Sequence, residues 1–209
     1  MKNKNYNKLT RGVLAVVAGA SLASISAMAQ IPYPSAGTII PNSNAQVLIA
    51  GTTNVLVTYI HGISGGDHDI LYLNGVEIFD NQINGLGDQV DLGLFTPGTV
   101  LNFTMTDFGH SGGPHPIIGT NTWNMGSGVN NTDGHVHAYV TSDGVDSHNN
   151  PLSYVGWEDE TVGQYWVDWN YNDLTFTFSS ATVTPAPEPT TLALAALGGA
   201  GLLLFRRRK

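Results

Sequence analysis

Hydrophobic and polar residues alternate with a period of two through much of the chain, and this pattern predicts β-strands. Within 53–60, for example, Val55, Val57 and Tyr59 fall on one face of the predicted strand. The dipeptide Asn74-Gly75 stands between two apolar runs and predicts a tight β-hairpin. The other predicted strands cover 46–50, 70–73, 76–79, 89–95, 99–107, 135–141, 152–157 and 173–183.

Roughly eight or nine short strands at close spacing predict an all-β domain, folded as a single β-sandwich or jelly-roll-like domain over 30–183. The alternation stops over 109–134, which is rich in Gly, Asn, Pro and His and is predicted to be a long loop. The chain has no Cys, so a hydrophobic core has to hold this domain without disulfide bonds.

The first 29 residues have the pattern of a secretory signal peptide. Four basic residues precede an apolar stretch at 12–25, and Ala27 and Ala29 form an A-x-A cleavage site. We therefore predict that signal peptidase removes 1–29 and leaves Gln30 as the first residue of the mature protein.

The C-terminal end has three parts: a Pro-rich spacer at 184–190, an apolar stretch at 191–205 and a basic tail at 206–209. The apolar stretch would form a single helix of roughly 22 Å, shorter than the roughly 30 Å hydrocarbon core of a membrane. The basic tail predicts a cytoplasmic C-terminus. The residues that carry this pattern are Pro187, Glu188, Pro189, Arg206, Arg207, Arg208 and Lys209.

This arrangement resembles the PEP-CTERM sorting signal of Gram-negative bacteria. The resemblance implies that an exosortase recognises the chain while its C-terminal helix holds it in the inner membrane. It also implies cleavage near the Pro-Glu-Pro, delivery to the cell surface or extracellular matrix, and contact with exopolysaccharide. The alternative is an ordinary tail anchor, which has no need of the Pro-Glu-Pro sequence.

Charge is distributed very unevenly along the chain. All 8 Lys and Arg lie in the first 11 or the last four residues, whereas all 16 Asp and Glu lie within 67–188. Such a domain repels nucleic acid, whose phosphates are bound by Lys and Arg. Carboxylates without counter-charges repel one another, and Ca²⁺ would relieve this repulsion. The alternative is an acidic surface that only keeps the protein soluble.

Two acidic segments, 158–159 and 168–173, are the best candidates for Ca²⁺ ligands. In the second, short oxygen-bearing side chains alternate, as at positions one, three and five of Ca²⁺-binding loops. The sixth position is Asp173 rather than Gly, so the segment is not an EF-hand. A turn held by side-chain hydrogen bonds is the alternative. The proposed ligands are Glu158, Asp159, Asp168, Asn170, Asn172 and Asp173.

The stretch 154–178 also resembles an Asp/Asn-rich domain of unknown function found in exported bacterial proteins. In that domain Asp is usual where this chain has Asn170, which weakens an ion site. The residues that carry this resemblance are Trp157, Glu158, Asp159, Asp168, Asn170, Tyr171, Asn172 and Asp173.

Two further patterns suggest other functions. His135 and His137 fall on one face of a predicted strand, a spacing that suits a transition metal and therefore a secreted metal-dependent hydrolase. Tyr165, with the Trp residues at 157, 166 and 169, could form the sugar-stacking surface of a carbohydrate-binding module, although such residues are more often core.

Taken together, these patterns lead us to expect a non-catalytic exported protein stabilised by Ca²⁺.

Trypsin should find no cleavage site between Gln30 and Phe205, because this part of the chain contains no Lys or Arg. Mass spectrometry of the denatured, digested protein should detect one large fragment beginning at Gln30. A fragment that begins at Gly12 would show that the leader is retained.

Overall fold

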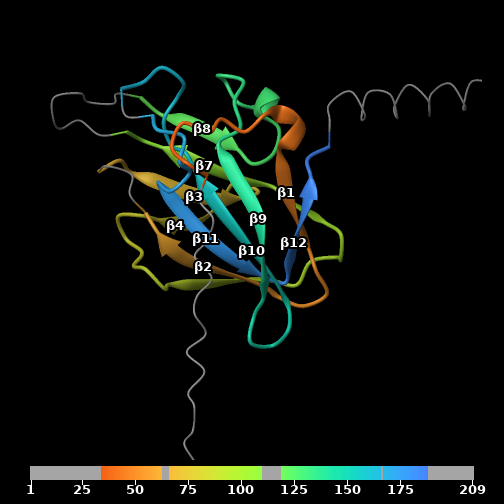
Figure 1. The fold of residues 1–209 in the computed structure, drawn as a ribbon. Coiled ribbons are helices and arrows are strands. Elements are labelled where there is room, and N and C mark those ends of the chain that lie inside the picture. Colours follow the sequence, from red (N-terminus) through yellow and green to blue (C-terminus); the bar gives the residue numbers. More distant parts are fainter. Residues whose placement is uncertain (1–33, 63–65, 110–118, 166, 188–209) are drawn as a thin grey trace, which may run out of the picture. The chain divides into compact units, whose positions relative to one another are not determined.

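The computed structural model describes residues 34–62, 66–109, 119–165 and 167–187. Within these residues the regular elements are strands, apart from two short 3₁₀ turns at Asn42–Asn44 and Gly128–Asn130 (Figure 1). This confirms the predicted all-β class. The strands are β1 (Gln46–Ala50), β2 (Val55–His61), β3 (Asp69–Leu73), β4 (Val76–Asp80), β5 (Gln89–Gly93), β6 (Val100–Leu101), β7 (Phe103–Asp107), β8 (Asn121–Asn124), β9 (Ala138–Val145), β10 (Pro151–Trp157), β11 (Leu174–Ser179) and β12 (Ala181–Pro185).

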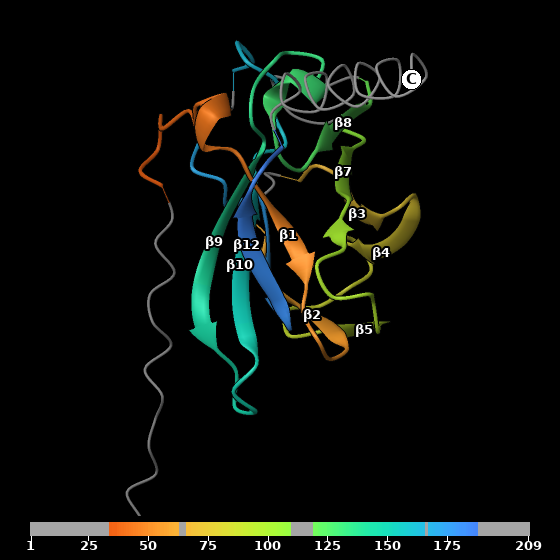
Figure 2. The ribbon, with the colours of Figure 1, turned by 90° about the vertical axis from the view of Figure 1, so that its right-hand side faces the viewer.

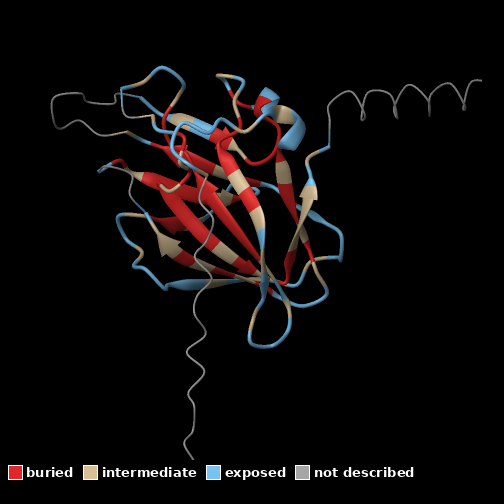
Figure 3. Ribbon diagram, viewed as in Figure 1, coloured by how far each residue is buried: buried red, intermediate tan, exposed pale blue. Residues whose placement is uncertain are grey.

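The strands form three antiparallel sheets that share one hydrophobic core. Sheet A has the order β12-β1-β6, sheet B the order β5-β2-β11-β10-β9 and sheet C the order β4-β3-β7-β8. Figure 2 shows β9 and β10 of sheet B on one side of the domain and β3, β4 and β7 of sheet C on the other. Figure 3 shows that the buried residues concentrate in the strands, while the connections are largely exposed.

Aromatic side chains pack between sheets B and C. Phe176 of β11 contacts Phe79 of β4, and their ring centroids are 5.2 Å apart. Phe178 contacts Phe103 of β7 at 4.9 Å. Fully burying a Phe side chain contributes roughly 1.5–3 kcal/mol, so these pairs are a substantial part of what holds the two sheets together.

The predicted hairpin is present between β3 and β4. Asn74 and Gly75 have φ angles of 52° and 78°, and Leu73 pairs with Val76 on either side of them. Positive φ at both central residues matches the twist of a two-residue hairpin, and Asn and Gly adopt it at low cost.

Two stretches predicted as single strands each divide and change sheets. The stretch 99–107 becomes β6 in sheet A and β7 in sheet C, separated by Asn102. The stretch 173–183 becomes β11 in sheet B and β12 in sheet A, separated by Ser180, whose φ is 59°. The Ser180 carbonyl accepts a hydrogen bond from the Gly51 amide at 2.7 Å, which holds this corner.

The long predicted loop at 109–134 contains a strand. Strand β8 pairs with β7, and Trp123 in the middle of β8 is fully buried. The polar residues around Trp123 hide this strand from a periodicity analysis. Part of the same stretch, 110–118, lies outside the described residues.

Both predicted processing segments also lie outside the described residues: the leader at 1–29, and the helix at 191–205 with the basic tail. Strand β12 runs to Pro185, and the Ala186 amide donates to the Ala45 carbonyl at 2.9 Å. The first residues assigned to the spacer at 184–190 therefore belong to the folded domain. No helix among the described residues is long and apolar enough to cross a membrane.

Gly156 in β10 allows the segment that precedes β11 to lie against this strand. A Cβ atom at Gly156 would be 2.1 Å from the backbone oxygen of Tyr171, which cannot move as a side chain could. We expect Gly156→Ala to lower the free energy of unfolding by about 2 kcal/mol or more, in the range of overpacked cores. Urea unfolding would measure this loss.

Gly85→Ala is the matched control, because a Cβ atom at Gly85 meets nothing within 4 Å among the described residues. Equal stability of the two variants would show that the chain does not pass this close to Gly156.

Candidate metal centre

Seven buried carboxylates lie where sheets B and C contribute strand ends and adjoining connections. Three come from the sheet C side: Asp67 precedes β3, Asp69 begins β3 and Asp107 ends β7. Asp69 and Asp107 stand directly opposite each other in the β3–β7 ladder. Like charges in this position destabilise a sheet, so the local arrangement carries an electrostatic cost. The other four, Glu158, Asp159 and Glu160 after β10 and Asp173 before β11, come from the sheet B side.

The segment after β10 is held by hydrogen bonds on several sides. The Glu158 amide donates to the carbonyl of His137 at 2.9 Å. The indole nitrogen of Trp123 donates to the backbone oxygen of Asp159 at 2.7 Å. The Asp159 amide donates to a carboxylate oxygen of Asp173 at 3.2 Å. The backbone of this segment is thereby fixed, and with it the positions from which the acidic side chains project.

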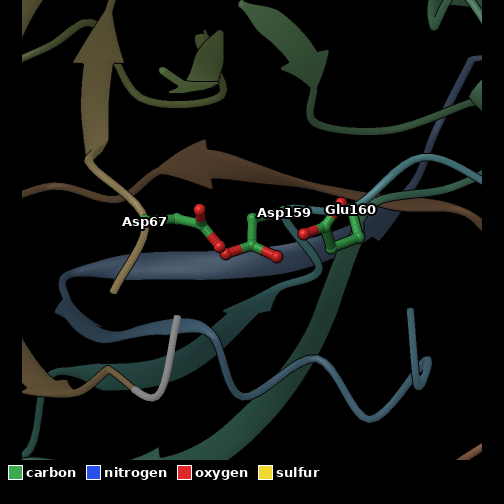
Figure 4. Close-up of side chains that lie close together, drawn as sticks. All are labelled: Asp67, Asp159 and Glu160. Atoms are coloured by element: carbon green, nitrogen blue, oxygen red, sulfur yellow. The ribbon is translucent and has the colours of Figure 1, made fainter. Parts of the chain in front are cut away.

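Two groups of carboxylates come close enough to share a cation. One consists of Glu158, Asp159 and Asp173, and the other of Asp67, Asp159 and Glu160. In each group the ligand oxygens lie within 4.8 Å of one another. Figure 4 shows Asp159 between Asp67 and Glu160, with the carboxylate oxygens of the three residues turned toward one another.

Burial and mutual repulsion make these carboxyl groups hold their protons. Burial raises the pKa of Glu158 to about 9, and the charge of Asp173 adds to the shift. Burial, followed by the charges of neighbouring acids, raises the pKa of Asp159 well above its usual range. Burial raises the pKa of Asp173 to about 7. Each value means that a proton or another cation has to neutralise the group in the folded state.

The domain has no Lys or Arg side chain to supply that positive charge. The part of the chain between Gln30 and Phe205 contains no Lys or Arg. Two histidines of the described residues pair with acids elsewhere: His68 Nε2 lies 3.1 Å from Asp80 and His137 Nε2 lies 3.0 Å from Asp133. An isolated buried carboxylate is strongly unfavourable, so the cluster fits a bound cation.

The structure brings together three of the six residues predicted as Ca²⁺ ligands: Glu158, Asp159 and Asp173. The exposed Asp168 instead accepts hydrogen bonds from the amide and the side chain of Asn170, at 3.0 and 2.5 Å.

Asn170 in turn accepts a hydrogen bond from the Asn172 amide at 2.9 Å. These three residues therefore form the side-chain-bonded turn that was the alternative at this position. Trp169 and Tyr171 have φ angles of 52° and 58°, so the segment is not the extended strand that would align alternating ligands.

Periodicity did not single out Asp67 and Glu160 as Ca²⁺ ligands. Asp67 lies 92 residues before Asp159 and reaches it only because sheets B and C pack together. Glu160 directly follows the predicted ligands Glu158 and Asp159, and this adjacency could have predicted it as a further ligand.

His135 and His137 lie before β9 rather than within it, and the two side chains are already engaged. The buried His137 has its Nδ1 2.9 Å from the carbonyl of Glu158 and its Nε2 3.0 Å from Asp133. Its ring stacks on Trp123 with centroids 3.6 Å apart. Nδ1 of His135 lies 2.9 Å from the carbonyl of Asp133. His137 thus has no ring nitrogen available to a metal in this arrangement.

The aromatic residues considered for sugar stacking divide between core and surface. Trp157 and Trp169 are 0% and 5% exposed, so they belong to the interior. Tyr165 is 69% exposed, and residue 166 lies outside the described residues. The described part of this set therefore offers one exposed ring rather than a stacking platform.

In protein stripped of metal ions, stability should fall as pH rises from about 5 to 8. The unfolded chain releases the Glu158 proton near the ordinary value of 4.5, whereas the folded chain keeps it until about 9. The folded state then binds more protons, so the free energy of unfolding decreases with pH. We expect a loss of about 4 kcal/mol over these three pH units, because each pH unit is worth about 1.4 kcal/mol when the folded state holds one more proton.

Urea unfolding in EDTA at both pH values, for the wild type and for Glu158→Gln, measures this slope. Burial lowers the pKa of His137, which acts in the opposite direction, so the comparison isolates the contribution of Glu158. Glu158→Gln should have the shallower fall, and an unchanged slope would contradict the assignment.

A family model for the PEP-CTERM protein-sorting motif matches residues 185–209. This confirms the resemblance inferred from Pro187 to Lys209, whereas the resemblance of 154–178 stays a prediction. No curated protein and no solved structure matches the chain. The motif implies processing by an exosortase after a stage of C-terminal membrane anchoring. The chain is therefore an exported protein that carries a PEP-CTERM sorting motif.

Proposed function

We propose that this chain is a non-catalytic protein of the cell surface or extracellular matrix of a Gram-negative bacterium, and that Ca²⁺ stabilises its β-sandwich domain. The ion is held by Glu158, Asp159 and Asp173. The sorting motif supports export, and its association with exopolysaccharide production supports a place in that matrix.

The buried side chain of Asp159 carries the calcium proposal. It is 3% exposed, and its Oδ2 atom has no hydrogen-bond partner among the described residues. Glu158 is 1% exposed, and its Oε2 atom also has no hydrogen-bond partner among the described residues. Buried polar atoms are nearly always hydrogen-bonded or bound to an ion. Two such oxygens in one group of three carboxylates are what a cation site requires.

The donor set favours a hard divalent cation. All ligands are carboxylate oxygens, which suit Ca²⁺ rather than the softer transition metals. With bonds of about 2.3–2.6 Å, two oxygens on opposite sides of a Ca²⁺ ion lie about 4.6–5.2 Å apart. The ligand oxygens of this group lie within 4.8 Å of one another, so the ion fits without a large movement of the chain.

The ion would act as a structural counter-charge. It joins the segment after β10 to the residue that precedes β11, two neighbouring strands of sheet B. A metal-dependent hydrolase built on His135 and His137 is less well supported, because both ring nitrogens of His137 are occupied. A carbohydrate-binding module is less well supported because Trp157 and Trp169 are buried.

Calcium should raise the melting temperature of the purified protein, and EDTA should reverse the effect. At 100 times the dissociation constant, a ligand specific for the folded state contributes about 2.7 kcal/mol. For a domain of this size, that corresponds to a shift of about 5–10 °C. Calorimetry with and without CaCl₂ at pH 7.5 measures it.

Asp173→Asn and Glu158→Gln should clearly reduce this calcium response, because each removes a ligand of this ion while keeping the shape of the side chain. Glu77→Gln is the matched control, since Glu77 is exposed on β4. Asp168→Asn should keep most of the response, because Asp168 forms a local turn. A full calcium response in Asp173→Asn and Glu158→Gln would refute the proposed site.

A further inference from the structure

Asp159 belongs to both carboxylate groups, and this shared position has a consequence for the number of ions. Figure 4 shows its carboxylate between those of Asp67 and Glu160. The group of Glu158 and Asp173 also includes Asp159. A carboxylate has two oxygens and can therefore bind two cations at once, one on each oxygen.

The second group resembles the first in burial and in the spacing of its oxygens. Asp67 and Glu160 are 6% and 3% exposed, and their ligand oxygens and that of Asp159 lie within 4.8 Å of one another. The Oδ2 atom of Asp159, without a hydrogen-bond partner among the described residues, lies in the buried carboxylate that joins the two groups. This spacing again suits Ca²⁺.

The cluster also extends beyond the three residues that hold the first ion. Seven buried carboxyl groups gather at this end of the domain, and four of them, Asp67, Asp69, Asp107 and Glu160, lie outside the first group. Asp69 and Asp107, opposite each other in the β3–β7 ladder, act electrostatically on Asp159 and add to the negative potential on the side of Asp67. The first group, which holds the first ion, does not include Asp67 or Glu160.

We propose that the domain holds a pair of calcium ions bridged by Asp159, with the second ion bound by Asp67, Asp159 and Glu160. This inference rests on the proposed function, and it adds a distinct role. The first ion connects two strands of sheet B. The second connects the segment after β10 to Asp67, which lies two residues before β3, and so joins sheet B to sheet C. The paired site thereby holds sheets B and C together at the end of the domain where the buried carboxyl groups lie.

Calcium stoichiometry tests this proposal directly. Protein expressed from the full-length chain is stripped with EDTA, dialysed and titrated with CaCl₂ by isothermal titration calorimetry. Equilibrium dialysis with elemental analysis counts the bound ions independently. We expect two calcium ions per chain in the wild type and in Glu77→Gln, and one in Glu160→Gln and in Asp67→Asn. Asp173→Asn should also retain one ion. Asp159→Asn should bind both ions more weakly than the wild type does.

Each outcome separates the pair from the single site. One ion in the wild type, unaffected by Glu160→Gln and lost in Asp173→Asn, would overturn the pair while leaving the proposed function intact. One ion that is lost in Glu160→Gln and kept in Asp173→Asn would overturn both the pair and the first site. No bound calcium in the wild type would overturn both proposals.

A folding control accompanies the titration. Each carboxamide variant removes a buried negative charge, so in EDTA its melting temperature should equal or exceed that of the wild type. A variant that passes this control and still binds two ions would overturn the assignment of its residue as a ligand. A variant that melts below the wild type in EDTA is replaced by Glu160→Ala or Asp67→Ala, for which the same ion counts are expected.

Discussion

The accumulation of negative charge where two sheets meet is the constraint on which the rest of this domain depends. The hydrophobic core brings sheets B and C together through contacts such as Phe176 with Phe79. The same packing brings acids of sheet C next to those that follow β10. Burial of apolar surface and repulsion between carboxylates therefore oppose each other in one structure. In the folded state these acids have to be neutralised by protons or another cation, and the domain sequence supplies no Lys or Arg for the purpose.

Sequence reasoning succeeded where a signal is local. The alternation of Val55, Val57 and Tyr59 with more exposed neighbours is sufficient to predict β2, because one face of the strand is buried. Asn74-Gly75 is sufficient to predict the hairpin, because few other dipeptides accept positive φ twice. The corners at Asn102 and Ser180 were not predictable in this way, because the alternation of side chains continues through a strand that changes sheets.

The same distinction between local and distant signals applies to the candidate metal centre. Residue type and proximity in sequence were sufficient to predict Glu158, Asp159 and Asp173 as ligands. Asp67 could not, because its place beside Asp159 depends on the packing of sheets B and C. The regular spacing of Asp168, Asn170 and Asn172 looked like a ligand pattern, but short polar side chains also bond to their own backbone. Composition alone cannot distinguish these two uses of Asp and Asn.

The pairing of β1 with β12 places the two ends of the described domain side by side. Gln46 at the start of β1 is opposite Pro185 at the end of β12, and ladder hydrogen bonds in antiparallel strands run perpendicular to the strands. A pulling force applied between the two ends would therefore break these hydrogen bonds one after another, beginning at Gln46 and Pro185. Traction applied at one end and at a distant loop would instead shear the ladder as a whole. The mechanical resistance of this domain thus depends on where it is held.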